Sequence, residues 1–302
     1  MAGRIALIFN PTARGNKARR FLRAVEALSG EAELLPTQRA GHAADLAAEA
    51  AARGCKTLVA AGGDGTVNEV LSGLARRPEW LDQVRVGVLP LGTMNVLARD
   101  LGIPMDPDRA WAVVREGVET RRDAPLIEFP KRPEQPPRLF AQLAGAGLDA
   151  IAVAEVKWEI KRRVGPLAYA LAGWKAWAAP PRLVRVCGAG FEATASLVLL
   201  GNGKRYGGEV IMFPEADPQD GLVDVRIFPR VGLKTLAGFA LAWLLGRPLP
   251  VGRGQRFFRA AELTLDAAAP MPIQADGDAA GLLPVRVRVL PRKLRLLVPP
   301  GR

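Results

Sequence analysis

Residues 57–73 read Thr-Leu-Val-Ala-Ala-Gly-Gly-Asp-Gly-Thr-Val-Asn-Glu-Val-Leu-Ser-Gly, an apolar strand that runs into three glycines around one aspartate. The glycines can take positive φ, so the backbone can turn several N–H groups toward one anion. The segment from Thr66 is expected to be a helix, whose N-terminal dipole also favours negative charge. Asp64 would repel a phosphate unless a cation such as Mg²⁺ lay between them, which indicates catalysis rather than passive anion capture.

Composition narrows the class of protein. The chain has 302 residues, more than one hydrophobic core usually organises, so two domains are expected. Its formal charge of +12 and pI near 10.5 point to anionic lipid or nucleic acid as partners, although an arginine-rich codon bias would give the same charge. No nucleic-acid-binding signature accompanies the charge, so we expect no nucleic-acid partner.

The chain contains only two cysteines and one histidine. Cys55 and Cys187 are too few for a disulfide framework and are typical of a reducing, cytoplasmic compartment. His42 is the sole histidine, which argues against zinc sites built on histidine pairs and against a Ser-His-Asp triad. No signal peptide or membrane-spanning helix is expected.

The first 124 residues alternate apolar runs with helical periodicity. We expect strands at 5–9, 32–36, 56–61 and 84–88 and helices at 15–28, 42–52, 66–76, 94–101 and 107–117. This alternation predicts an α/β domain with an open, mostly parallel sheet covered by helices on both faces. Ligands of such sheets bind beyond the carboxyl ends of the strands, where loops 10–15, 62–66 and 90–95 should converge.

From about Asp123 the pattern changes. Prolines at 130–137 break any helix, and β-type runs follow at 138–144, 183–187, 194–201, 223–228, 256–266 and 285–290. This second domain, 125–291, is predicted to be largely antiparallel β, interrupted by helices at 165–179 and 232–245. The closing apolar segment within 292–300 is expected to return to the first domain, 1–124, as an added strand.

Four segments together resemble the bacterial diacylglycerol kinase-like lipid kinases, relatives of the sphingosine kinases. They are Gly62-Gly-Asp-Gly-Thr-Val-Asn-Glu-Val70, Pro90-Leu-Gly-Thr-Met-Asn95 with Ala98-Arg-Asp-Leu-Gly-Ile-Pro104, Gly145-Ala-Gly-Leu-Asp149 and Pro214-Glu-Ala-Asp-Pro-Gln-Asp-Gly-Leu-Val-Asp224. The glycine-aspartate segment alone would also suit NAD kinases and phosphofructokinases. The combination covers nearly the whole chain and is specific.

The resemblance implies an NAD kinase/phosphofructokinase-like nucleotide-binding half and a β-sandwich lipid-substrate half, with ATP and a lipid alcohol meeting between them. Family members transfer the γ-phosphate of ATP to a hydroxyl, with Mg²⁺. Phosphoryl transfer needs mainly positioning and charge neutralisation, which glycine-rich backbone donors, Mg²⁺ and carboxylates can supply. By the family pattern the nucleotide site consists of Asn10, Thr37, Gly62, Gly63, Asp64, Gly65, Thr66, Glu69, Thr93 and Asn95.

Each of these positions also has a purely structural interpretation. Asn10 with Pro11 would end a strand in an ordinary turn. Thr93 and Asn95 would cap the helix expected at 94–101, and Glu69 would support a helix start.

Three aspartates carry catalysis in the resemblance. Asp276 matches the aspartate that accepts the proton of the lipid hydroxyl, and Asp149 matches a carboxylate that helps Asp64 organise the metal. Asp276 with Gly277 would equally close a β-hairpin, because Asp-Gly is a strong turn signal. Asp149 would alternatively sit in a simple strand-end loop. The family usually has glutamate two residues after the first aspartate, where this chain has the shorter Asp278.

The loop at 214–224 contains Asp217, Asp220 and Asp224. These residues are rich in oxygen ligands, which a hard cation prefers. In the resemblance this loop holds a regulatory Mg²⁺ through the carboxylates of Asp217 and Asp220 and the carbonyl of Leu222. A solvated acidic turn is the alternative.

The two apolar, tryptophan-bearing helices expected at 165–179 and 232–245 suggest membrane contact. Lys157, Lys161, Arg162 and Arg163 precede the first of them. Apolar aromatic surface beside basic charge lets a peripheral protein rest on an anionic leaflet, here the inner face of the membrane. Core packing is the alternative, and we expect it for most of the surface of both helices.

The sequence thus predicts an ATP-dependent lipid kinase that phosphorylates diacylglycerol or a related lipid alcohol. The alternatives are a soluble-substrate kinase of the NAD kinase type and a non-catalytic basic protein that binds lipid or nucleic acid. The lipid species is not readable from the chain, and a homodimer stays open.

Overall fold

The computed structural model describes residues 5–11, 25, 28–155, 182–188, 190–206, 210–252 and 254–301. The helix expected at 165–179, the basic residues before it and most of the helix expected at 15–28 lie outside the described residues. The chain divides into two compact units, Met1–Ala124 with Pro291–Arg302 and Pro125–Leu290.

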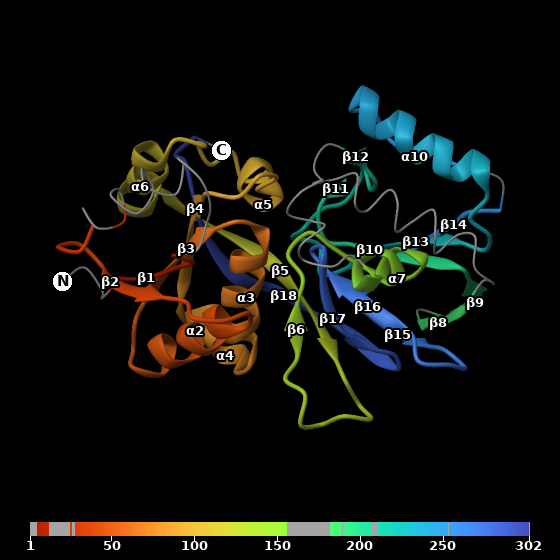
Figure 1. Ribbon diagram of the computed structural model, residues 1–302, viewed down its shortest axis with the longest axis horizontal. Coiled ribbons are helices and arrows are strands. Elements are labelled where there is room, and N and C mark those ends of the chain that lie inside the picture. Colours follow the sequence, from red (N-terminus) through yellow and green to blue (C-terminus); the bar gives the residue numbers. More distant parts are fainter. Residues whose placement is uncertain are drawn as a thin grey trace. The chain divides into compact units, whose positions relative to one another are not determined.

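The first unit is built on parallel strands in the order β2-β1-β3-β4, with the end of β18 beside β4. Its elements are β1 (Ile5–Phe9), β2 (Glu33–Pro36), α2 (His42–Ala52), β3 (Thr57–Gly62), α3 (Asp64–Ala75), α4 (Pro78–Gln83), β4 (Arg85–Pro90), α5 (Val96–Asp100), α6 (Pro107–Glu116) and the start of β5 (Val118–Glu128). Figure 1 shows α6 on the opposite side of these strands from α2 and α4.

The central strands are apolar throughout because helices cover both faces of the sheet. β3 is buried along its whole length, and four of the five residues of β1 are buried. Small residues let the helices pack closely against each other. Gly73 of α3 lies so close to α2 that an added Cβ would come within 2.3 Å of the carbonyl oxygen of Ala44. The residues that gave the helical and strand periodicity are therefore the ones that fill the core.

The second unit contains a six-stranded antiparallel sheet in the order β14-β13-β10-β7-β16-β17, and facing strands β18-β15-β8-β9. Its elements are β6 (Arg138–Leu139), β7 (Leu143–Gly147), α7 (Leu148–Glu155), β8 (Val184–Gly188), β9 (Phe191–Ala195), β10 (Leu197–Gly201), β11 (Arg205–Tyr206), β12 (Val210–Ile211), β13 (Val223–Phe228), α10 (Leu233–Leu245), β14 (Arg256–Ala260), β15 (Glu262–Asp266), β16 (Pro272–Ala275), β17 (Asp278–Leu282) and β18 (Val285–Val298). Together the two units confirm the predicted fold class.

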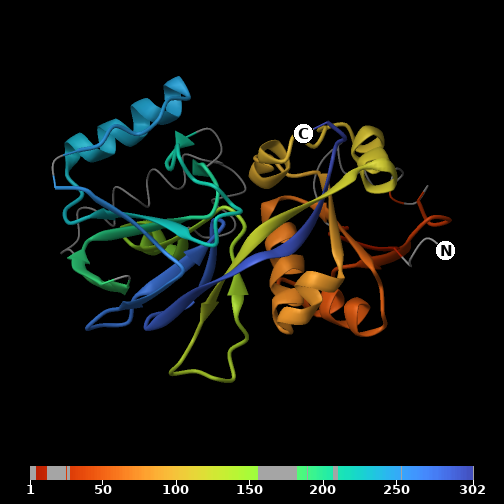
Figure 2. The same ribbon diagram turned by 180° about the vertical axis from the view of Figure 1, so that it is seen from behind.

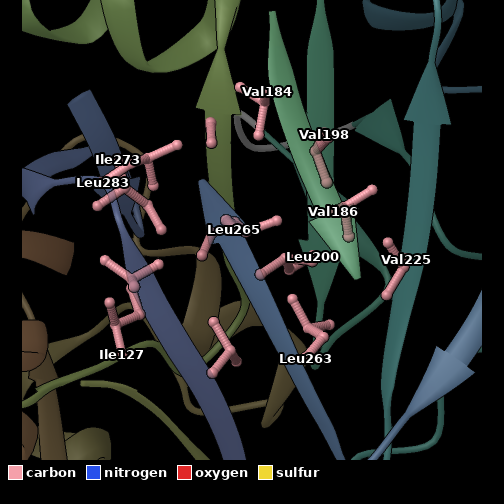
Figure 3. Packing of buried hydrophobic residues seen from close by; sticks show 14 of the residues in the cluster. Ile127, Val184, Val186, Val198, Leu200, Val225, Leu263, Leu265, Ile273 and Leu283 are labelled. Atoms are coloured by element: carbon pink, nitrogen blue, oxygen red, sulfur yellow. The ribbon is translucent and has the colours of Figure 1, made fainter. Parts of the chain in front are cut away.

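The two layers of the second unit enclose one hydrophobic core, seen in Figure 3. Val198 and Leu200 of β10 point into it and meet Val186 of β8 and Leu265 of β15. The alternate residues Leu197 and Leu199 join a second cluster on the other side of the sheet, under α10. Because both of its faces are covered, β10 is apolar at every position.

Two strands, β5 and β18, each continue from one unit into the other along the chain, as Figure 2 shows. The sequence suggested separate β runs at 285–290 and 294–298. The structure has instead a single strand, β18, that contains Pro291 and a positive φ of 50° at Arg292. The backbone N–H of Arg292 donates to the buried Asp123 carboxylate at 2.7 Å, which holds this irregularity in place.

Several expected elements need correction. The runs at 194–201 and 256–266 are each two strands, joined at Ser196 and Ala261. Helix α3 begins at Asp64, two residues earlier than expected, because Gly63 is extended with φ −88° and ψ −174°. The expected positive φ in this loop is also wrong, since the described residues with positive φ lie elsewhere.

Candidate functional site

One candidate site lies in the first unit, at the carboxyl ends of its parallel strands. Strand register places Phe9 beside Pro36 and Ala61, and Gly62 beside Pro90. The loops that follow these strands are therefore neighbours along one edge. The residues that the resemblance assigns to the nucleotide site either follow these strands or lie within the first two turns of α3: Asn10, Thr37, Gly62, Gly63, Asp64, Gly65, Thr66, Glu69, Thr93 and Asn95.

The glycines of this edge are required by close packing, not by positive φ. An added Cβ on Gly92 would lie 2.5 Å from Cα of Gly63 and 2.9 Å from Oδ1 of Asn95. An added Cβ on Gly62 would lie 2.3 Å from the hydroxyl of Thr66. Two adjacent loops thus meet backbone against backbone, which side chains at these positions would prevent.

Asp64 links the two loops. Its carboxylate Oδ1 accepts a hydrogen bond of 2.7 Å from the backbone N–H of Val96, the first residue of α5. The carboxylate therefore satisfies one of the N–H groups that a helix start leaves without an intrahelical partner. Asp64 also stands in the first turn of α3, whose N-terminal dipole favours a negative charge.

Asn95 closes the second loop on itself. Its Oδ1 accepts from the N–H of Gly92 at 2.9 Å, and its Nδ2 donates to the Gly92 carbonyl at 2.8 Å. The residue has a left-handed φ of 48° and precedes α5, but its side chain does not cap that helix. The capping role that the sequence suggested for Asn95 thus belongs to Asp64.

Glu69 supports a helix start, as one interpretation of the sequence suggested, but the helix is α2. The Glu69 carboxylate accepts from the N–H of Gly41 at 2.9 Å and from that of Ala43 at 3.1 Å. These bonds join α3 to the beginning of α2.

Another candidate site lies in the second unit, at the turn between β16 and β17. Asp276 and Gly277 have positive φ values of 50° and 86°, the conformation that an Asp-Gly pair favours in a two-residue hairpin turn. Its carboxylate accepts three consecutive backbone N–H groups, from Ala141 at 2.7 Å, Gln142 at 2.9 Å and Leu143 at 3.0 Å. The hairpin turn that the sequence suggested is present, and the carboxylate is fixed in one orientation.

Asp149, at the start of α7, is joined to the same turn. It accepts hydrogen bonds from the Tyr206 hydroxyl and from Nε2 of the buried Gln274 at 2.7 Å, and Oε1 of Gln274 accepts from the Gly277 N–H at 2.8 Å. Burial raises the pKa of Asp149, and the hydrogen bonds from Tyr206 and Gln274 oppose that rise. The carboxyl is thus poised nearer to protonation than an ordinary aspartate.

Gly145 makes room for this network. It pairs with Gln274 across β7 and β16, and an added Cβ would lie 2.3 Å from Oδ2 of Asp149 and 3.0 Å from Nε2 of Gln274. A register shift between Ile273 and Gln274 marks a bulge at this point, a feature that re-aims side chains. Gly145 is therefore required because a side chain at this position would displace Asp149 and Gln274.

Sequence reasoning missed Tyr206 and Gln274. Gln274 lies in β16, two residues before Asp276, and its burial could have been suspected from its apolar neighbours. Tyr206 carries no local signal, because its link to Asp149 joins residues 57 positions apart.

The acidic loop before β13 is tied down by its own backbone and by one arginine. Oδ1 of Asp217 accepts from the Gln219 N–H at 3.0 Å, and Oδ1 of Asp220 accepts from the Leu222 N–H at 2.9 Å. The Arg259 guanidinium donates to Asp224 at 3.0 Å and lies 3.7 Å from Asp220. Burial raises the pKa of Asp224, whereas the bond to Arg259 lowers it.

The donor chemistry of this loop fits a hard cation only in part. Asp217, Asp220 and Leu222 offer carboxylate and carbonyl oxygens, the ligands that Mg²⁺ prefers. Within the described part of the chain, however, no three His, Cys, Asp or Glu side chains gather closely enough to hold a metal. Arg259 already supplies positive charge to Asp220.

Comparison with known proteins agrees with this architecture. The family described as "Diacylglycerol kinase catalytic domain" matches residues 4–125, and the one described as "YegS C-terminal NAD kinase beta sandwich-like domain" matches residues 142–298. A Pseudomonas aeruginosa protein named "Probable lipid kinase YegS-like" is 31% identical over 306 residues, which cover 99% of this chain and 95% of that protein. A diacylglycerol kinase of Staphylococcus carnosus is 28% identical over 310 residues, covering 99% and 96%.

Solved structures show the same fold. The crystal structure of a diacylglycerol kinase from Bacillus anthracis superposes with a TM-score of 0.75 at 21% identity, covering 99% of this chain and 98% of that one. Yeast NADH kinase complexed with NADH gives a TM-score of 0.55 at 12% identity, covering 98% and 83%. The resemblance stated from the sequence is confirmed, and the chain belongs to the YegS-like family of lipid kinases that carry a diacylglycerol kinase catalytic domain.

Proposed function

We propose that this lipid kinase transfers the γ-phosphate of ATP to the hydroxyl of a lipid alcohol, diacylglycerol or a related lipid. The observation that carries the proposal is the Asp276 turn, where three backbone N–H donors hold a carboxylate in one orientation. A carboxylate fixed in this way can orient a hydroxyl and accept its proton. The name of the Staphylococcus carnosus relative supports diacylglycerol as the substrate.

The first unit is proposed to bind the nucleotide. Its carboxyl edge offers the N-terminus of α3 and glycines that let a phosphate approach the backbone. When bound beside Asp64, Mg²⁺ would neutralise the charge of the phosphates. Asp64 remains fixed by its bond to Val96, so its carboxylate needs no reordering when the nucleotide binds.

Asp276 is proposed to orient the lipid hydroxyl and to accept its proton late in the transfer. An aliphatic alcohol is far less acidic than an aspartate of pKa about 3.9, so complete deprotonation before transfer is not expected. The three N–H donors hold the acceptor oxygens still while the proton moves. This follows the loose transition state of phosphoryl transfer, in which positioning dominates.

Asp149 is proposed to position Asp276. Through Gln274 it is connected to the N–H of Gly277, the residue next to Asp276. Asp149 is therefore connected to the Asp276 turn by two consecutive hydrogen bonds through Gln274.

Two further proposals concern partners. Asp217, Asp220 and Leu222 would hold a regulatory Mg²⁺, in competition with Arg259 for the charge of the loop. The protein would act as a peripheral enzyme at the inner face of an anionic membrane. Analytical ultracentrifugation would show whether it forms a homodimer.

Incubation of the protein with labelled ATP and Mg²⁺ tests the substrate. One reaction contains total cellular lipid and the other contains NAD, with mass spectrometry of the products. We expect label in a lipid phosphate and none in NAD. Label in NAD alone would replace the proposal with a soluble-substrate kinase.

A further inference from the structure

Helix α10 presents an apolar stripe to solvent. Leu233, Leu241, Leu244 and Leu245 are 57%, 54%, 72% and 51% exposed, and the exposed Ala237 lies between the first two. Their spacing of i, i+4, i+8, i+11 and i+12 places all five on one face. Figure 1 shows the helix running along the outside of the second unit.

The opposite face of α10 already supplies what the core needs. Ala242 is buried in the cluster under the helix, and the Phe239 ring lies 5.8 Å from that of Phe228 and 6.3 Å from that of Tyr206. The exposed leucines therefore add nothing to this core. Four large exposed apolar side chains in one row mark an interaction surface.

The chain segment that carries the stripe has charge of one sign. Residues 225–261 contain no aspartate or glutamate and seven basic residues: Arg226, Arg230, Lys234, Arg247, Arg253, Arg256 and Arg259. Arg259 pairs with Asp224, and Arg256 lies over the Phe191 ring of the inter-sheet core. Arg230, Lys234 and Arg247 are exposed within α10 or a few residues from its ends, so they offer positive charge beside the leucines.

Arg226 fixes the segment that follows α10 to the sheet. Its guanidinium is 1% exposed and donates to the carbonyls of Met212, Leu249 and Pro250 at 3.2, 3.2 and 2.9 Å. It also lies 5.2 Å and 4.9 Å from the rings of Phe228 and Phe257. The stripe is thus carried on a fixed support.

We propose that this α10 stripe docks on an anionic lipid bilayer, with the helix lying in the interface and the basic residues contacting lipid phosphates. Thirteen residues span about 20 Å, less than a hydrocarbon core of about 30 Å, so the helix lies on the bilayer and does not cross it. Among the described helices none has the length and apolarity of a membrane span. The inference deepens the proposed function, on which it rests for the partner's chemistry.

A second copy of the chain fits this surface less well. A two-fold interface would bring the same patch of both protomers together and would oppose Arg230, Lys234 and Arg247 to their own equivalents. Like charges brought together disfavour association, whereas phosphatidylglycerol headgroups complement them.

Co-sedimentation with vesicles of equal parts phosphatidylcholine and phosphatidylglycerol tests the proposal. We compare the wild-type protein with Leu241→Ser/Leu244→Ser, with Lys234→Glu/Arg247→Glu, and with the control Leu183→Ser. Leu183 is 50% exposed and precedes β8 in the opposite layer. We expect at least a tenfold loss of vesicle partitioning in both double variants, none in the control, and a wild-type affinity that falls with salt.

Unchanged partitioning of folded Leu241→Ser/Leu244→Ser would overturn the proposal. So would a wild-type dimer, seen by analytical ultracentrifugation, that this variant splits without losing vesicle binding. Turnover of a short-chain diacylglycerol dissolved as monomers should stay at the wild-type level in that variant. A wild-type protein that binds vesicles through the stripe but phosphorylates no lipid would refute the proposed substrate while upholding the docking surface.

Discussion

The Gln274 side chain donates to the Asp149 carboxylate at 2.7 Å and, through its own oxygen, accepts the N–H of Gly277. One buried amide thus joins the carboxyl whose pKa is raised to the turn that aims Asp276. Asp149 and the Asp276 turn therefore belong to one hydrogen-bonded network, in which the neutral Gln274 is the link.

Gln274→Leu should break both links while keeping the size of the side chain. Loss of the donor removes one interaction that lowers the Asp149 pKa, so the acidic limb of the kcat profile should move to higher pH and kcat should fall at least tenfold. Gln83→Leu, at the exposed end of α4, is the control. A pH profile identical to that of the wild type would show that Gln274 does not position Asp149.

Asp149 should make stability depend on pH. Burial raises its folded pKa above 3.8, so its favourable contribution is complete below that value and is lost as pH rises through the folded pKa. Asp149→Asn should therefore gain stability relative to the wild type as the pH rises from about 4 toward 7. Urea unfolding across this range measures the difference in the free energy of unfolding between the variant and the wild type. If this difference does not change in favour of the variant as the pH rises, the Asp149 carboxyl ionises as it does in water.

Two variants of Asp64 should distinguish its structural role from its catalytic role. Asp64→Ala removes the acceptor for the Val96 N–H and should lower the free energy of unfolding by about 1 kcal/mol. Asp64→Asn keeps an acceptor oxygen but loses the charge, so it should retain most of the stability and lose at least a hundredfold in kcat. Kinetics and thermal melting of both variants check this. An active Asp64→Asn would limit the residue to its capping role.

Gly92→Ala should strain the carboxyl edge of the first unit. The new Cβ would lie 2.5 Å from Cα of Gly63, where only backbone can move, and should cost about 1–3 kcal/mol. Gly30→Ala is the matched control, because an added Cβ there meets nothing within 4 Å. Equal unfolding midpoints for the two variants would contradict the close approach of the loops.

The sequence predicted those features that depend on local chemistry. Apolar periodicity located β1, α2, β3 and β4 within one or two residues, because both faces of that sheet are covered and each strand is continuously apolar. The Asp-Gly pair at 276 and 277 predicted its hairpin for the same local reason. Helix α4 and strand β5 were missed, since short or partly exposed segments give weak periodicity.

The contacts between distant residues could not be read from the chain. The bond from Val96 to Asp64 joins loops that meet only when β3 and β4 pair, so Asn95 looked like the cap from its position alone. The glycines of the 62–65 loop suggested positive φ, whereas Gly62 leaves room for the Thr66 side chain and Gly63 for the backbone of Gly92. Tyr206 reaches Asp149 only because α7 and β11 belong to one folded unit.

Phosphorylation of diacylglycerol by Asp276→Asn is the most direct test of the proposed chemistry. Asp266→Asn, an exposed carboxylate at the end of β15, serves as the matched control. The account predicts labelled phosphatidic acid from the wild type and from the control, and at least a hundredfold lower kcat from a folded Asp276→Asn. Wild-type turnover in that variant would show that the N–H-held carboxylate takes no part in the transfer.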